Sequence, residues 1–142
     1  MEIKEIVQTL IKENGASCPF KLSKIFKVGI LYEDLGTMMG YYSRDYRFKF
    51  IHINQNLPSR MQRFVCAHEL GHALLHPDVN TPFLSRCTLF SKSKVERQAN
   101  IFAVELLMPD KLLQEYNETS LYNIAAKLGI PDRLADLKEI EK

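Results

Sequence analysis

The chain has 142 residues, of which 46% are hydrophobic and 25% charged, with 19 basic against 17 acidic side chains and a formal net charge of +2. This length suits one domain with its own core, and the near-balance of charge excludes a strong field for nucleic acid or an anionic membrane. Three cysteines without close Cys-x-x-Cys spacing favour reduced thiols, and no stretch is long enough to span a bilayer, so we expect a soluble cytoplasmic protein.

The N-terminal part predicts two helices followed by a small sheet. Charged and apolar residues interleave at helical spacing before Gly15, which indicates an amphipathic helix and not a signal peptide. Residues 19–26 predict a second, short helix. Three segments predict the strands of an antiparallel sheet: residues 29–33, 37–43 and 46–54. We expect the last strand to lie at an edge, where an extended substrate peptide can pair with it.

The most informative segment of the chain is His68-Glu69-x-x-His72. Residues four apart lie one above the other on a helix, so the two imidazoles can bind one metal ion. Glu69 falls beside them, where a carboxylate can take a proton from a metal-bound water. This is the arrangement of a zinc hydrolase. The alternative is a core helix whose histidines hydrogen-bond to backbone groups.

The residues around this motif predict a buried helix. Pro58 and Ser59 open it, Gln62 completes a Ser-x-x-Gln capping box, and Pro77 ends it. Apolar residues surround the histidines on more than one face, as in a helix within a core. Gly71 in mid-helix costs about 1 kcal/mol relative to alanine, which makes sense if another backbone segment passes close to the metal face.

A catalytic zinc site normally has three protein ligands and a water, so a third ligand must come from another segment. Residues 93–109 predict a second helix, with Glu96 and Asn100 on one face. Glu96 can offer a carboxylate oxygen to the ion, and Asn100 can accept the spare ring N–H of a zinc-bound imidazole. An alternative stays open, because Ser93-x-x-Glu96 is also a capping-box pattern. Glu105 points about a quarter-turn away from that face, and we expect it to be solvated.

Three further features have open roles. His76, one turn beyond His72, can hydrogen-bond within the site, contact substrate, or be purely structural. Residues 77–92 are long enough to form a cleft wall or lid, or simply to pack their apolar residues on the core. Tyrosines in the strand region offer oxyanion donors, but tyrosines in strands are more often packed side chains, so none is assigned.

The tail from residue 110 predicts further helices. Residues 121–130 have an Ala-x-x-x-Gly spacing found in helix-turn-helix segments, which raises DNA binding as a rival hypothesis. Against it, residues 131–142 hold four acids and three bases where a recognition segment needs positive charge. We therefore expect packing or contact with a protein substrate, and no direct contact with nucleic acid or membrane.

Two motifs resemble the ImmA/IrrE-type metallopeptidases, a family found in phages, integrative elements and bacterial stress regulators. They are residues 63–77 around His-Glu-x-x-His, and Glu96-x-x-Ala99-Asn100-x-Phe102-Ala103 leading into residues 106–109. The resemblance covers most of the chain. The predicted elements indicate an α+β fold in which a small antiparallel sheet of about three strands packs against the buried motif helix, a second ligand-bearing helix and short terminal helices. We expect one metallopeptidase domain over residues 1–142, with helices and sheet in 1–57, the catalytic core in 58–109 and C-terminal helices in 110–142.

The resemblance also implies a gluzincin-like site, with one Zn²⁺ per chain on His68, His72 and Glu96 and with Glu69 as general base. Where family members often carry a second acid, this chain has Gln98, which leaves Glu96 as the acid that ligates. The implied activity is site-specific endoproteolysis of a regulatory protein, a helix-turn-helix repressor of a phage or mobile element. A second hypothesis is a metal-binding regulatory or toxin–antitoxin-type module that binds a partner protein without turnover. Manganese or iron can occupy the same ligands.

Overall fold

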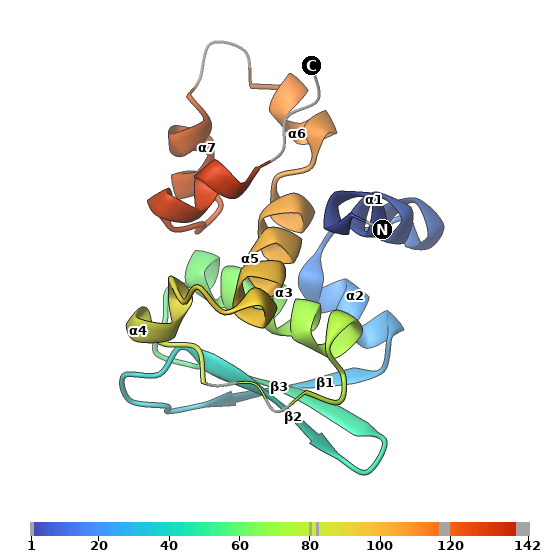
Figure 1. Cartoon of the computed structure of the whole chain (residues 1–142), viewed down its shortest axis with the longest axis vertical. Helices are drawn as coiled ribbons and strands as arrows, with labels where there is room; N and C mark the ends of the chain where they lie inside the picture. The colour runs from blue at the N-terminus through green and yellow to red at the C-terminus, as the bar shows by residue number, and fades with distance from the viewer. Residues whose placement is uncertain (1, 80, 82, 117–119, 139–142) are drawn as a thin grey trace.

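The computed structural model describes residues 2–79, 81, 83–116 and 120–138, without the side chains of residues 86 and 87. The chain is α+β, as the sequence predicts (Figure 1). Its elements follow in the order α1 (Ile3–Asn14), α2 (Pro19–Ile25), β1 (Val28–Glu33), β2 (Gly40–Asp45), β3 (Phe48–Asn54), α3 (Ser59–Leu75), α4 (Arg86–Leu89), α5 (Lys94–Leu107), α6 (Asp110–Gln114), α7 (Leu121–Lys127) and the 3-10 helix η1 (Asp132–Leu137).

The sheet has the strand order β1-β3-β2, which makes β3 the central strand. β2 and β3 form the predicted antiparallel hairpin, whose turn falls at Tyr46 and Arg47, but β1 pairs with β3 in parallel. The connection between β1 and β2 carries the chain past the position of β3, so β1 and β3 run in the same direction. The prediction that the last strand lies at an edge is therefore wrong, and the two edges belong to β1 and β2.

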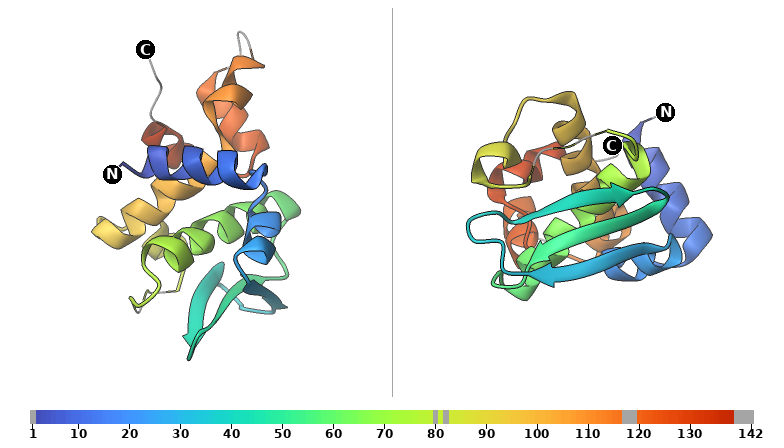
Figure 2. Two further views of the ribbon diagram at one scale, coloured as in Figure 1. Left: turned by 90° about the vertical axis from the view of Figure 1, so that its right-hand side faces the viewer. Right: turned by 90° about the horizontal axis from the view of Figure 1, so that it is seen from below.

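The helices lie on one side of the sheet, and Figure 2 shows the other side uncovered. α3 runs along the inner face of the sheet, and α5 crosses α3 on its far side (Figure 1). Because α3 has the sheet below it and α5 above it, every residue from 64 to 73 is buried. This explains why apolar residues are needed on more than one face of α3.

The start of α3 differs from the predicted capping box. The N-cap residue is Pro58, and no side chain caps the helix. The Gln62 amide donates instead to the backbone oxygens of Gln55, at 3.3 Å, and Leu57, at 3.0 Å. Gln62 thus ties the helix to the loop that leads into it from β3.

Gly71 is the point where α5 approaches α3. A Cβ atom at this position would lie 3.1 Å from three atoms of the Phe102 side chain. The close neighbour is therefore a side chain of α5 and not the backbone segment that we predicted. Glycine allows the two helices to pack closely enough for the side chains of α5 to reach those of α3.

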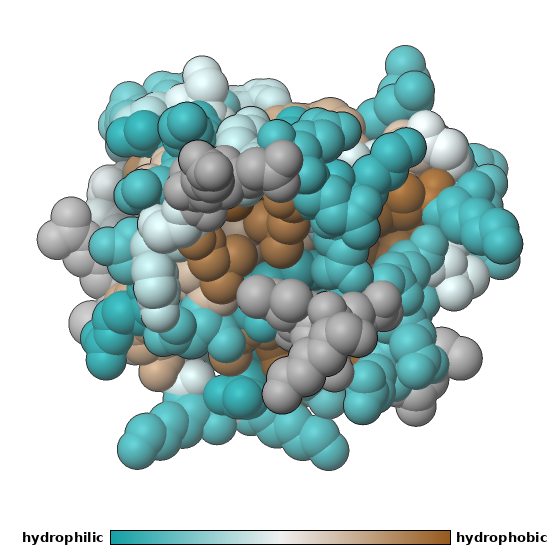
Figure 3. Space-filling view, turned by 90° about the horizontal axis from the view of Figure 1, so that it is seen from above, coloured by the Kyte–Doolittle hydropathy of each residue, from teal (hydrophilic) through white to brown (hydrophobic). Residues whose placement is uncertain are grey.

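The C-terminal helices pack against this core. Gly129, which follows α7, has a φ of +77°, and a Cβ atom there would lie 2.2 Å from the backbone oxygen of Arg60 at the start of α3. The Ala-x-x-x-Gly spacing that suggested a helix-turn-helix segment is thus explained by a left-handed turn pressed against α3. Seen from above, this side of the molecule shows separate apolar patches among polar residues (Figure 3).

Glu105 is buried, and the prediction that it is solvated is wrong. Its side chain is 3% exposed, because residues from η1 to Lys138 close over it. The Nζ atom of Lys138 lies 2.6 Å from Glu105 Oε1 and 2.8 Å from Asp110 Oδ1, and Lys4 binds the other oxygen of Asp110. This ion cluster joins α1, the end of α5, the start of α6 and the C-terminal segment.

The segment between α3 and α5 both packs on the core and forms part of the surface. Leu84 and Leu89 are buried, whereas Phe83 and Phe90 are exposed. Leu84 also forms an antiparallel bridge with Gly40, at the free edge of β2. Across the part of the chain that the structure describes, helices are too short or too polar to cross a membrane.

Candidate metal centre

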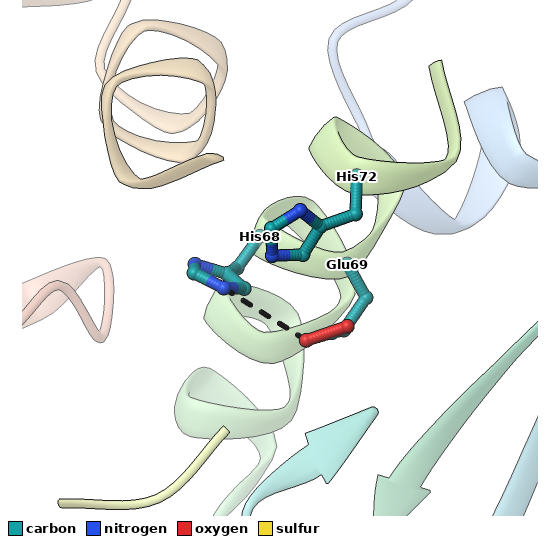
Figure 4. Close-up of side chains that lie close together, drawn as sticks. All are labelled: His68, Glu69 and His72. Carbon is teal, nitrogen blue, oxygen red and sulfur yellow. Dashed lines mark ion pairs between the residues drawn. The ribbon is translucent and has the colours of Figure 1, made fainter. Parts of the chain in front are cut away.

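Three side chains of α3 converge at the centre of the molecule. His68, Glu69 and His72 have no exposed surface, and each offers a donor atom within 4.8 Å of the others. Figure 4 shows both imidazoles and the carboxylate extending to the same side of α3. The closest ion-pair distance between Glu69 and an imidazole is 3.8 Å, from its Oε1 atom to His68 Nε2. The helical spacing thus brings these groups together as the sequence predicts, with Glu69 beside the pair of histidines.

Glu96 reaches the same point from α5. Its Oε1 atom lies 3.2 Å from His68 Nε2, and its Oε2 atom lies 2.8 Å from His72 Nε2. Ser93 makes no side-chain cap to α5, so the capping box that was the alternative for Glu96 does not form. The carboxylate of Glu96 instead spans the two nitrogens that a metal ion would use.

The hydrogen bonding of these atoms fits a cation. Among the residues that the structure describes, both oxygens of Glu69 are buried without a hydrogen-bond partner, and the buried Nε2 atom of His72 and Oε2 atom of Glu96 face each other at 2.8 Å without a further partner. Buried polar atoms are almost always paired, so the unpaired carboxylate of Glu69 beside these atoms points to a ligand. Donor atoms around a tetrahedral zinc ion lie about 3.3 Å apart, close to the 3.2 and 2.8 Å separations between Glu96 and the imidazoles.

A second layer of side chains orients the imidazoles. Asn100 Oδ1 lies 2.8 Å from His68 Nδ1, and the Asn100 amide nitrogen donates to the backbone oxygen of Leu89 at 2.8 Å. Because that bond fixes which end of the amide faces His68, Asn100 accepts the Nδ1–H of His68. The Nε2 atom of His68 then keeps its lone pair for the metal position, as the predicted role of Asn100 requires.

His76 contacts the other imidazole. Its Nδ1 atom lies 3.2 Å from His72 Nδ1, and its Nε2 atom lies 2.7 Å from Gln98 Oε1. Among the roles left open for His76, the structure therefore places it in hydrogen bonding within the site. The contact with Gln98 is absent from the sequence predictions, although Gln98 lies only two residues from Glu96.

The two carboxylates of the site have opposite pKa shifts. Burial raises the pKa of Glu69 to about 8, an effect that the electrostatic interaction with His72 opposes and the interaction with Glu96 reinforces. Burial also acts to raise the pKa of Glu96, but its contacts with His68 and His72 outweigh burial and lower that pKa to about 2. Glu96 is thus a permanent anion suited to a cation, whereas Glu69 exchanges a proton near neutral pH.

Comparison with known proteins agrees with this arrangement. The family model of the IrrE N-terminal-like domain, a peptidase family, matches residues 24–137. The chain is 46% identical over 143 residues to "Uncharacterized immunity region protein 2" of Bacillus phage phi105, covering 99% of this chain and 90% of that protein. It is 39% identical over 142 residues to "Metallopeptidase ImmA" of Bacillus subtilis strain 168, covering 96% of this chain and 83% of that protein. The chain belongs to the ImmA/IrrE-type metallopeptidase family, as its two motifs predict.

Proposed function

We propose that this chain is a zinc-dependent endopeptidase that cuts one regulatory protein at a specific site, and that its substrate is a helix-turn-helix repressor of a phage or mobile element. One observation carries the proposal: the carboxylate of Glu96 meets the Nε2 atoms of His68 and His72 within 3.2 Å, beside the unpaired carboxylate of Glu69. The names of the two relatives, a phage immunity region protein and a metallopeptidase, support the regulatory setting and the activity.

In this proposal His68, His72 and Glu96 hold one Zn²⁺. When bound, the ion supplies a Lewis acid and lowers the pKa of a coordinated water. Glu69 accepts the proton that the attacking water loses, and it returns that proton to the nitrogen of the departing amine. A neighbouring divalent charge favours the ionised form of Glu69, so the high pKa set by burial falls toward the range needed for a base at neutral pH.

We infer that the substrate enters as a strand along β2. Gly40 of β2 lies against α3, since a Cβ atom there would be 2.5 Å from Val65 Cγ1, one turn before Glu69. The free edge of β2 therefore runs beside the catalytic helix. In this structure Leu84 occupies that edge, donating to the Gly40 oxygen at 2.8 Å and accepting from the Met39 nitrogen at 2.7 Å.

A cavity of about 790 Å³ continues along the same edge of β2. It approaches the metal centre only at its end, where Pro77 follows His76, and none of the four site residues lines it. Because the site residues are almost fully buried, a peptide must displace part of the segment after α3 to reach them. The cavity lies between two stretches of chain, one formed by Tyr41, Tyr42, Ser43, Arg44 and Tyr46, the other by Pro77, Asp78, Val79, Thr81 and Phe83.

The test is cleavage of a candidate repressor, encoded beside this chain, by zinc-loaded protein. The wild type should yield two fragments of defined mass, and Glu69→Gln should lower the rate by at least about 100-fold because it removes the base and keeps the ligands. Glu115→Gln, at an exposed acid that ends α6, is the matched control and should cleave normally. Equal cleavage by wild type and Glu69→Gln would refute the mechanism, and stable binding of the repressor without any cleavage would favour the non-enzymatic module.

A further inference from the structure

A line of three side chains leads away from the metal centre to Gln98. His72 Nδ1 lies 3.2 Å from His76 Nδ1, and His76 Nε2 lies 2.7 Å from Gln98 Oε1. A neutral imidazole has one N–H donor and one bare nitrogen acceptor. The hydrogen on one ring therefore determines where the hydrogen of the next ring lies, and the whole line has only two consistent arrangements.

In the first arrangement, Gln98 accepts a hydrogen bond through Oε1. His76 then carries its hydrogen on Nε2, and its bare Nδ1 accepts the Nδ1–H of His72. The Nε2 atom of His72 keeps its lone pair and can bind a cation. The orientation of Gln98 fits this arrangement, because its Oε1 atom faces His76 Nε2.

In the second arrangement, the Gln98 amide is turned over and donates to His76. Both rings then exchange their tautomers, and the Nε2 atom of His72 carries a hydrogen. That nitrogen can donate to Glu96 Oε2, 2.8 Å away, but it cannot bind a metal ion. The orientation of one amide thus decides whether His72 is a ligand.

The two amides that support the site are held differently. The nitrogen of Asn100 is tied to the Leu89 oxygen, so its direction is fixed. Among the described residues, no hydrogen bond holds the amide nitrogen of Gln98, which lies at a hollow between the N-terminal end of α1 and the first turns of α5. His68 therefore has a permanently oriented partner, whereas the partner of His72 can turn.

We propose that Gln98 is a positioning residue, which makes His72 a metal ligand by accepting a hydrogen bond from His76. The inference rests on the proposed function of the site, but it concerns the proton positions in the metal-free protein. A glutamate at position 98 would be an acceptor only and would hold the first arrangement. A methionine, similar in size, would offer His76 neither a hydrogen-bond donor nor a strong acceptor.

The experiment measures tautomers and zinc affinity in the same set of variants. Long-range ¹H–¹⁵N NMR of the metal-free protein reports which ring nitrogen of each histidine carries hydrogen, and competition with a chelator gives the zinc affinity. Gln98→Met should increase the Nε2–H form of His72 and weaken zinc binding about tenfold. This is the lower end of the loss in affinity that is usual when a residue supporting a metal ligand is replaced. Gln98→Glu should keep His72 in the Nδ1–H form and bind zinc at least as tightly as the wild type. Gln114→Glu, at an exposed glutamine, controls for added charge.

The tautomer of His68 serves as the control for folding, since Asn100 sets it independently. If Gln98→Met is folded and leaves both the His72 tautomer and the zinc affinity unchanged, the proposal is wrong. If Gln98→Met does not fold, Gln98→Glu still decides, because a His72 that carries its hydrogen on Nε2 in that variant contradicts the relay. Failure of the wild type to bind zinc would instead refute the proposed function and leave the tautomer result valid.

Discussion

The metal-free protein should become less stable as the pH rises, and Glu69 is the residue responsible. Its pKa is about 8 in the folded state against 4.5 for an exposed glutamate. Between these values the folded state holds a proton that the unfolded state has lost, so the free energy of unfolding falls with increasing pH. The slope approaches 1.4 kcal/mol per pH unit, which amounts to about 3.5 kcal/mol between pH 5 and pH 8. That figure is an upper limit, because water entering the site would screen the charge.

Glu69→Gln isolates this contribution, because the amide has nearly the same shape and never ionises. Urea unfolding of both proteins in the presence of a chelator, at pH 5, 6, 7 and 8, gives the difference in the free energy of unfolding. The variant should match the wild type near pH 5 and exceed it by about 3 kcal/mol at pH 8. Burial lowers the pKa of His76, which has the opposite effect: it makes the folded state more stable relative to the unfolded state as the pH rises. This contribution is common to both proteins, so it cancels in their difference. A difference that does not change with pH would refute the reasoning.

Three further substitutions test other parts of the structure. Gly129→Ala should lower the free energy of unfolding by at least about 2 kcal/mol in urea denaturation, because φ is +77° and a Cβ atom has no room; a change below 0.5 kcal/mol, the size usual at surface sites, would contradict that packing. Asn100→Ala should weaken zinc binding 10- to 100-fold in chelator competition, because the orientation of His68 is lost; an unchanged affinity would show that the contact is dispensable. Lys138→Met should cost about 3 kcal/mol in thermal unfolding, since the buried Glu105 carboxylate loses a partner, and an unchanged midpoint would argue against a folded C-terminal segment.

The sequence predicts those parts of the site that depend on a single helix. His68 and His72 are four residues apart, and Glu69 is adjacent to His68, so their common position follows from helix geometry alone. Glu96 and Asn100 are likewise placed on one face by their spacing. Helix spacing alone does not predict that this face meets the histidines. The resemblance to a family implied that contact, and the packing of α5 on α3 shows it.

Most of the errors concern contacts between residues distant in sequence. Alternation of apolar and polar residues indicates a strand but does not say which strand is central, so the parallel pairing of β1 with β3 could not be predicted. Glu105 was expected to be solvated because it points away from the face of Glu96 and Asn100, but it pairs with Lys138, which is 33 residues away. Gln62 and Ser59 have the spacing of a capping box, yet backbone oxygens of the preceding loop bind the Gln62 amide instead. Local patterns identify possible partners, and tertiary packing selects among them.

The burial of α3 links substrate entry to exposure of the metal centre. A helix between a sheet and a second helix can hold unpaired acids and imidazoles away from water, which strengthens their action on a bound cation but leaves a peptide no direct route. The edge of β2 is covered by the segment whose backbone hydrogen bonds join Leu84 to Met39 and Gly40. A substrate strand that paired with β2 would form the same kind of bonds in the same place. In our proposal, the substrate strand therefore replaces the Leu84 segment at β2, and the same exchange opens the site. A peptide too short to replace the hydrogen bonds of Leu84 should be cleaved slowly even when it contains the correct site.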